Sequence, residues 1–473
     1  MKKHLRFVAT LTILSLLVPL LAGCGSATPA EEAPTSEDVV AATDEPTTKP
    51  EPTEEPTTEQ EPTEEPTAPP EPTETQPVTV RYWSISGEAS EEEVADAFRI
   101  EHPDINLQYE VIPYDAYWDK LNAALESGVG PDAFMLPAPL VLEYVLREQL
   151  APMPDDWAQT MEEERLAWTI KPLKIEGKYY GFPAGAGMRV LLVNTDLLEE
   201  VGLEDEPCPS DWNQLRDYAE QLTKRDDKGN MTQAGLDMIS QAYHLYGALM
   251  DQNIPGGPLL YVDGEIPKAN YANEGGYETW QFINELYNES KVDDMAFIPD
   301  QYRFQIGKAA MMVSGFYQVA YVLGEEIPVN FQICPIPTPP ENPESRDGRG
   351  DQWAYVVSSR SENPDAAWEW ARHFASAESE KLLSLSGYTM VTHKSLLEDP
   401  DLLAEPYLAA GFQILRDVEG VPPGGGWDDI WYLHEAVWER IYLEAPEDIK
   451  PYVDELQEGA QELYDTKYGE YYQ

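Results

Sequence analysis

Hydrophobic and polar residues alternate in a regular order from residue 78 onward. The segment Val78–Trp83, VTVRYW, is typical of a buried strand. Apolar residues at helical spacing follow it, with Ser90 and Glu93 placed as a capping box. The segment Ile105–Val111 then alternates as a second strand does. This order predicts a parallel sheet with helices on its faces, and it puts Trp83 near the edge where ligands bind in such sheets.

The same kind of pattern continues along the chain. It predicts a helix over 116–126, a short strand over 133–136, an apolar strand over 190–193 and a helix capped by Ser210. About 400 residues follow the N-terminal region, which is more than one hydrophobic core usually serves. We therefore expect an α/β protein with two lobes.

The first residues have the features of an export signal. A basic head precedes the apolar run Phe7–Ala22, which is shorter than the ~20 residues that a membrane-spanning helix needs. The run ends in LAGC, which resembles the lipobox of bacterial lipoproteins. That resemblance implies that 1–23 are a signal peptide and that Cys24 is acylated as a lipid anchor. An ordinary signal peptide with a cysteine near its cleavage site is the alternative.

Residues 24–77 join this anchor to the folded part. They are rich in Glu, Pro and Thr, contain the heptapeptide EPTEEPT twice, and include no aromatic residue. Such a composition cannot bury a core, and its prolines and one-sided charge keep the chain extended. We therefore expect a disordered linker that holds the folded part away from a membrane.

The net charge limits the ligand classes that the chain can bind, and the number of cysteines limits the disulfides that it can form. The whole chain carries a net charge of −56, and a surface this acidic repels phosphate backbones. The charge therefore argues against nucleic-acid binding. Cys208 and Cys334 are too few for a disulfide scaffold, and the sequence leaves open whether they form one bridge.

Three groups of residues resemble a known family. They are Tyr180–Pro183 before Leu192–Asp196, Gly307–Met311 before Gly315, and Asn363–Trp368. In this order, on a chain with a lipobox, they resemble the extracellular solute-binding proteins of ABC importers, in the sugar-binding family typified by maltose-binding protein. The resemblance implies a two-lobe periplasmic-binding-protein-like fold of type II. In that fold the ligand cleft lies between lobes that a hinge of several crossings joins.

The resemblance also divides the folded part into lobes of two segments each. The first lobe is assigned to 78–187 with 354–390, and the second to 188–353 with 391–473. The chain is expected to cross between the lobes near 185–188, 352–354 and 390–393.

A sugar has hydroxyl groups around its ring and an apolar C–H face, so aromatic side chains with a few polar partners line its sites. The resemblance places Trp83 in the cleft from the first lobe, and an aromatic stacking position just after Gly315 in the second. Arg189 and two neighbours of the cleft are candidate hydroxyl partners. The candidate ligand-binding residues are Trp83, Arg189, Gln241, Tyr243, Phe316, Tyr317, Trp353, Trp427, Trp431 and Tyr432.

Aromatic residues on amphipathic helices usually pack in a core instead. On this ground Trp212, Trp280, Trp368 and Trp438 are assigned to packing. By spacing alone Trp431 fits a buried stripe as well as a cleft, and the resemblance decides for the cleft.

One segment departs from the family pattern. Many sugar-binding relatives carry a charged or amide residue where this chain has Pro137 and Pro139. Neither proline offers a side-chain hydrogen bond. We therefore do not assign the polar ligand site of maltose-binding relatives to this chain, and the sequence does not identify the sugar.

The sequence offers no clear catalytic motif. Its histidines are isolated, and no H-E-x-x-H, paired Cys-x-x-Cys or phosphate-binding loop is present. Carboxylate pairs such as Asp428 with Glu435 could be chosen for a glycosidase, but their spacing alone does not support one. We expect a binding protein that is not an enzyme and has no cofactor or metal. A secreted glycoside hydrolase and an adhesive surface lipoprotein are the alternatives.

The resemblance implies capture and delivery. A mono- or oligosaccharide would bind between the lobes, and the closed form would dock on ABC permease subunits that a separate ATPase serves. The protein is expected to act as a monomer at the extracellular face of the cell membrane, held there by its lipid anchor.

Overall fold

A computed structural model describes residues 77–85, 89–299, 301–326, 328–345, 350, 352–387, 389–416, 418, 420–424 and 427–472, with only the backbone of Trp427 and Asp428. The predicted signal peptide, Cys24 and the linker up to residue 76 lie outside these residues. Within the described part of the chain, no helix is both long and apolar enough to cross a membrane.

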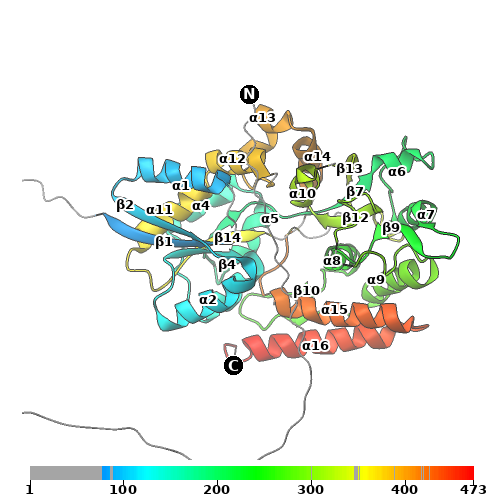
Figure 1. Ribbon diagram of the computed structural model, residues 1–473. Coiled ribbons are helices and arrows are strands. Elements are labelled where there is room, and N and C mark those ends of the chain that lie inside the picture. Colours follow the sequence, from blue (N-terminus) through cyan, green and yellow to red (C-terminus); the bar gives the residue numbers. More distant parts are fainter. Residues whose placement is uncertain are drawn as a thin grey trace, which may run out of the picture. The chain divides into compact units, whose positions relative to one another are not determined.

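The first sheet combines the N-terminal strands with one late strand (Figure 1). Its order is β2 (Ile105–Val111), β1 (Val78–Ser84), β3 (Ala133–Pro137), β14 (Trp353–Val357) and β6 (Phe182–Ala184). β1 runs parallel to both of its neighbours, whereas β14 is antiparallel to β3 and β6. The three strands predicted for this part of the chain are confirmed.

Helices cover both faces of the first sheet. α1 (Ala89–Glu101) and α11 (Pro364–Phe374) lie on one side, and α2 (Tyr114–Ser127) lies on the other (Figure 1). Buried Trp370 of α11 packs edge-on against Tyr82 of β1 and Phe98 of α1, with ring centroids 5.2 and 5.1 Å apart. Further helices of this lobe are α3 (Val141–Leu146), α4 (Asp155–Glu164), α5 (Ala167–Ile170) and α12 (Ala377–Gly387).

The second sheet has the order β13 (Phe331–Cys334), β7 (Arg189–Asn194), β12 (Ala309–Gly315), β9 (Met231–Asp237) and β8 (Lys224–Arg225). β12 is buried at every position, because it lies between β7 and β9 at the centre of the sheet. β7 contains the apolar strand predicted over 190–193, which is confirmed.

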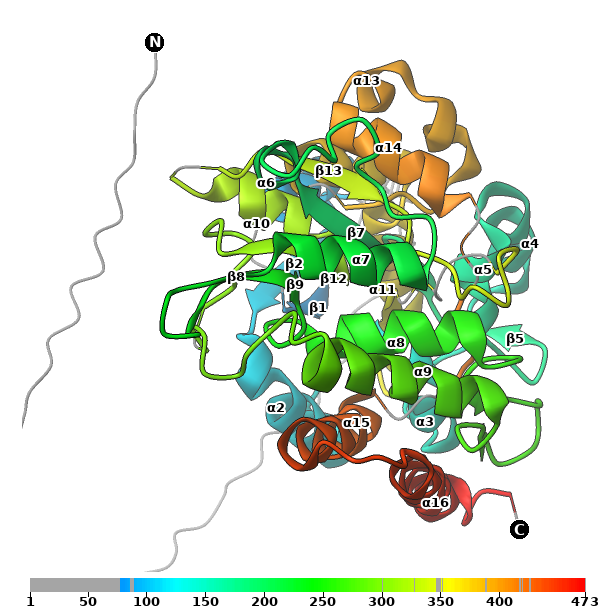
Figure 2. The same cartoon turned by 90° about the vertical axis from the view of Figure 1, so that its right-hand side faces the viewer.

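Several helices pack around the second sheet, as the turned view shows (Figure 2). They are α6 (Thr195–Glu199), α7 (Trp212–Leu222), α8 (Ala242–Asn253), α9 (Glu274–Asn284), α10 (Gln318–Gly324), α13 (Pro400–Leu403), α14 (Pro406–Leu415), α15 (Trp427–Glu444) and α16 (Lys450–Tyr468). α15 and α16 pack on each other and against α8 and α9. The cap of α7 differs from the prediction: Asp211, not Ser210, accepts the Gln214 N–H, because Asp211 is the last extended residue before the helix.

Short elements complete the chain. They are η1 (Ala138–Leu140), η2 (Lys171–Leu173), η3 (Glu285–Glu289), η4 (Lys394–Glu398), β4 (Lys174–Ile175), β5 (Lys178–Tyr179), β10 (Leu259–Leu260) and β11 (Lys268–Ala269).

The chain passes from one sheet to the other between β6 and β7 and again between β13 and β14. An isolated bridge between Ala186 and Met390 brings the first of these passages next to the later segment that precedes η4. β14 begins at Trp353, one residue before the predicted start of the second segment of the first lobe.

Cys208 and Cys334 form a disulfide, with their Cα atoms 5.4 Å apart. The bridge ties the loop before α7 to the end of β13. Disulfides persist in oxidising compartments, so the bridge is consistent with a protein that is exported.

Candidate functional site

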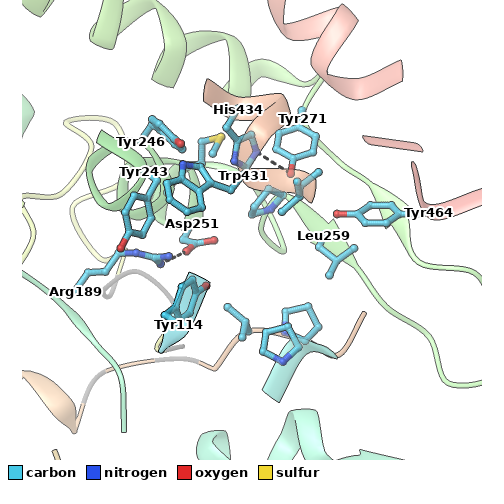
Figure 3. Close-up of a pocket in the computed structure, with 17 residues that line it drawn as sticks. Tyr114, Arg189, Tyr243, Tyr246, Asp251, Leu259, Tyr271, Trp431, His434 and Tyr464 are labelled. Carbon is cyan, nitrogen blue, oxygen red and sulfur yellow. Dashed lines mark hydrogen bonds and ion pairs between the residues drawn. The ribbon is translucent and has the colours of Figure 1, made fainter. Parts of the chain in front are cut away.

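A cavity of about 210 Å³ is lined by residues of both lobes (Figure 3). The first lobe contributes Tyr114, at the start of α2, and Pro139 of η1. The second contributes most of the lining, chiefly from α8 and α15. Its lining residues are Arg189, Tyr243, Tyr246, Gly247, Met250, Asp251, Pro258, Leu259, Tyr271, Val421, Pro422, Ile430, Trp431, His434 and Tyr464.

Two aromatic rings from different helices form one wall of the cavity. Tyr243 belongs to the first turn of α8 and Trp431 to the first turns of α15. Their ring centroids are 4.9 Å apart at an interplanar angle of 42°. Both residues were predicted to bind ligand, and the structure brings them together at the cavity. Aromatic faces placed side by side in this way provide a platform for the C–H face of a ring ligand.

An ion pair lies beside this wall. Arg189 begins β7, and its Nη1 donates to the Asp251 Oδ2 of α8 at 3.0 Å. The two side chains are only 12 % and 6 % exposed. Gly247 lies against the pair, since a Cβ there would stand 3.4 Å from the guanidinium carbon. The ion pair therefore holds the guanidinium donors and the carboxylate acceptors at fixed positions beside the aromatic wall.

Tyr317 is not part of the cavity lining, although its hydroxyl is 3.5 Å from the hydroxyl of Tyr243, and it is 41 % exposed. Its hydroxyl donates to Gln241 Oε1 at 3.0 Å and lies 3.1 Å from His244 Nε2. Because the hydroxyl has a single proton, His244 donates from Nε2. Burial, together with the charge of Arg189, lowers the pKa of His244 well below its ordinary value, so this histidine is neutral.

Gly315 is required for the position of Tyr317. A Cβ at this residue would lie 2.4 Å from the Tyr317 ring, which folds back over the end of β12. The glycine therefore lets the ring reach Gln241 and His244. It explains in physical terms why the aromatic residue follows a glycine here.

A second buried network closes the far end of the cavity. His434 Nε2 lies 3.0 Å from the Tyr271 hydroxyl, which in turn hydrogen bonds with Tyr464. Burial, and then the charge of Arg189, lowers the pKa of His434 to about 3. The histidine is therefore neutral at physiological pH, and this end of the cavity presents uncharged rings.

The other predicted ligand residues whose side chains the structure describes are not part of the cavity lining. Trp83 is 9 % exposed, with the Lys120 ammonium 4.4 Å above its ring, and Phe316 is 3 % exposed, so both belong to the core. Trp353 stacks on Trp118, with ring centroids 6.1 Å apart. The predicted residue Tyr432 is 62 % exposed on the surface of α15. The side chain of Trp427 is outside the described part of the structure.

Sequence reasoning missed several lining residues, among them Tyr246, Asp251 and His434. A helical pattern could have found them. Tyr246 and Asp251 follow Tyr243 at spacings that return to the same face of α8, and His434 follows Trp431 by three residues. Tyr246 has a buried hydroxyl without a hydrogen-bond partner among the described residues.

The residues that the structure describes in the lining include no pair of facing carboxylates. Among the described lining residues Asp251 is the sole carboxylate, and Arg189 engages it. Glycoside hydrolysis ordinarily uses two carboxyl groups across the scissile bond. The described residues also contain no cluster of three or more His, Cys, Asp or Glu that could hold a metal ion.

Comparison with known proteins gives a consistent result. Residues 83–381 match the family described as bacterial extracellular solute-binding protein. A protein of Brucella abortus is 23 % identical over 380 residues, which are 77 % of this chain and 88 % of that protein. The galactooligosaccharide-binding protein of Bacillus subtilis is 22 % identical over 360 residues, 73 % of this chain and 80 % of that protein.

Solved structures share the fold at low sequence identity. An ABC substrate-binding protein of Listeria monocytogenes in complex with cycloalternan has a TM-score of 0.68 and 18 % identity, and covers 83 % of this chain and 100 % of its own. The cyclic alpha-maltosyl-1,6-maltose binding protein of Arthrobacter globiformis has a TM-score of 0.67 and 18 % identity, with 82 % and 100 % covered. The predicted two-lobe fold of type II and the resemblance to solute-binding proteins are confirmed.

Proposed function

Because the chain belongs to the family of bacterial extracellular solute-binding proteins, we propose that it captures a carbohydrate in the cavity between its lobes and delivers it to an ABC permease. The observation that carries this proposal is the paired aromatic wall of Tyr243 and Trp431 beside the Arg189–Asp251 ion pair. Stacking rings take the apolar face of a sugar, and fixed polar groups take its hydroxyls. The galactooligosaccharide named for the Bacillus subtilis relative and the maltosyl-maltose named for the Arthrobacter globiformis protein support the same ligand class.

The lobes are expected to close on the ligand, because residues of both lobes line the cavity. Tyr114 comes from the first lobe, whereas Tyr243 and Trp431 come from the second. A ligand that contacts both lobes binds a closed form better than an open form, and so it shifts the population toward the closed form. The closed form is then the species that the permease recognises, while a separate ATPase supplies the energy.

We also propose that the mature protein is held at the extracellular face of the membrane by acylated Cys24. The linker that follows it would let the folded part work at a distance from the membrane. Replacing Cys24 with Ser should release the protein from membranes while its affinity for ligand stays the same. A Cys24→Ser protein that stays in the membrane fraction after a salt wash would contradict the anchor.

The test of the proposed function is a ligand screen with the full chain. Isothermal titration calorimetry against a panel of mono- and oligosaccharides should detect saturable one-to-one binding of at least one sugar. Chromatography of the same mixtures after long incubation should recover the sugar unchanged. Turnover of the sugar would indicate a glycoside hydrolase instead, and absence of binding to every sugar in the panel would contradict carbohydrate capture.

A further inference from the structure

The cavity has two chemically different ends. Tyr243, Arg189 and Asp251 lie at one end, and Leu259 and Tyr464 lie toward the other (Figure 3). The charged ion pair is at the first end only. A ligand that fills the cavity therefore meets a polar aromatic surface at one side and a different surface at the other.

The second end is apolar. Leu259 and Pro422 line this cavity and also line a second hollow together, so they lie close to each other. Pro258 and Val421 are their neighbours in the chain and line the same cavity, so this end is formed by aliphatic side chains and prolines. None of the described residues lining the cavity is Ser, Thr, Asn, Gln, Lys or Glu.

The polar atoms near the apolar end already have partners. His434 hydrogen bonds with Tyr271, and Tyr271 hydrogen bonds with Tyr464. His434 is also uncharged, because burial lowers its pKa to about 3. These groups form a closed network that presents its ring surfaces to the cavity, so they offer little to a row of ligand hydroxyls.

A bare sugar fits such an end poorly. Most ring carbons of an ordinary sugar carry a hydroxyl, and a hydroxyl that loses water without gaining a partner costs free energy. An apolar group in the same place would instead gain from leaving water. The sugar ring therefore fits the Tyr243 end of the cavity, and a group without hydroxyls fits the Leu259 end.

We propose that the ligand is a sugar that carries a compact apolar substituent, such as an aryl or short acyl group, and that this substituent occupies the Leu259 end of the cavity. The inference rests on the proposed carbohydrate function and makes its substrate class narrower. It assigns recognition of the sugar to Tyr243 and Trp431, and recognition of the substituent to Leu259 and Val421.

Matched pairs of ligands test this inference with the full chain. Maltose, cellobiose, lactose, xylobiose and mannobiose are each titrated by calorimetry as the free disaccharide and as its para-nitrophenyl glycoside. For at least one sugar the aryl glycoside should bind at least about tenfold more tightly than the free sugar, because the ring leaves water at the apolar end. para-Nitrophenol alone should bind far more weakly than that glycoside.

Two neighbouring leucines provide a matched control. Leu259 is 6 % exposed and lines the cavity, whereas Leu260, the next residue of β10, is 41 % exposed and does not. Leu259→Asn should remove most of the preference for the aryl glycoside, and Leu260→Asn should keep it. Val421→Thr preserves the shape of the side chain, and it should weaken binding of the aryl glycoside more than binding of the free sugar. Because this change is small, it tests the apolar contact even if Leu259→Asn has a folding defect.

The outcomes separate the two proposals. If sugars bind but every free disaccharide equals its aryl glycoside in affinity, the apolar substituent is refuted while carbohydrate capture stands. If para-nitrophenol alone binds as tightly as the glycosides, the cavity recognises the aryl group without the sugar, and the inference is also overturned. If no member of any pair binds, both the inference and carbohydrate capture fail.

Discussion

Replacing Glu380 with Gln should destabilise the protein strongly, because this carboxylate lies in a buried charge cluster close to a passage between the lobes. Glu380 of α12 is 5 % exposed, and its Oε1 is 2.5 Å from Arg165 Nη1. Its Oε2 accepts the backbone N–H groups of Thr392 and His393 at 3.0 and 3.1 Å. The cluster thus joins α12 to the segment at 392–393.

The magnitude follows from the pKa of Glu380. Burial alone would raise this pKa, but the charge of Arg165 and the hydrogen bond with His393 outweigh burial and lower it from 4.5 to about 2. At 1.36 kcal/mol per pKa unit, the folded state favours the ionised carboxylate by roughly 3 kcal/mol. Since the folded pKa is lowered, this stability is present above pH ~4.5 and is lost as the pH falls toward 2.

Urea denaturation of the wild type and of Glu380→Gln at several pH values measures this contribution. At pH 7 the variant should be less stable by roughly 3 kcal/mol, and the difference should shrink between pH ~4.5 and 2. Glu398→Gln is the matched control, because Glu398 pairs with Arg416 at 2.5 Å on the surface, where the side chains are 74 % and 51 % exposed. That control should stay within about 0.5 kcal/mol of the wild type. Equal stabilities of the two variants at pH 7 would refute the reasoning.

Three further predictions concern the disulfide, the cavity and the core. Replacing Cys208 and Cys334 with Ser opens a loop of 126 residues and should cost up to about 5 kcal/mol of stability in urea denaturation; a variant as stable as the wild type would contradict a formed bridge. Affinity for a neutral sugar should change less than about twofold between pH 5 and 8, because the lowered pKa keeps His434 neutral throughout; a step in affinity near pH 6.5 would contradict this. Trp368→Ala should cost ~3–5 kcal/mol in melting experiments, because Trp368 is 2 % exposed, and calorimetry of the surviving folded protein should find its affinity unchanged; a large loss of affinity would place Trp368 near the ligand.

The order of elements could be predicted because its pattern is strong and local. The segments Val78–Trp83 and Ile105–Val111 are apolar or alternating over their whole length, and both became strands of the first sheet. The cap of α7 shifted by one residue, since Ser210 and Asp211 are equally good caps and only the backbone conformation chooses between them. The disulfide was left open because its cysteines are distant in sequence and only the folded second lobe brings them together.

The site could be predicted only in part. Of the candidate ligand residues, Trp431, which the family resemblance selected, and Arg189 and Tyr243, which were candidate hydroxyl partners, all line the cavity. Phe316, which the resemblance places in the cleft, is not part of this cavity's lining for a physical reason: its ring lies against Gly411 of α14, where an added Cβ would come within 2.5 Å of it. A strand pattern gives the face of a residue but not the distant segment that covers that face. Trp83 is also not part of this cavity's lining, and the ammonium of Lys120 in α2 lies over its ring.

The most direct test of carbohydrate capture at this cavity is the affinity of Trp431→Ala for the sugar that binds most tightly in the screen, measured by calorimetry beside the melting temperature. Removing one of the two rings of the aromatic wall should cost at least ~2 kcal/mol of binding free energy, which is a loss of about thirtyfold in affinity. The half-buried position of Trp431 leaves the melting temperature close to that of the wild type. Unchanged affinity in a Trp431→Ala protein that melts normally would contradict the account, because the sugar would then bind away from this wall.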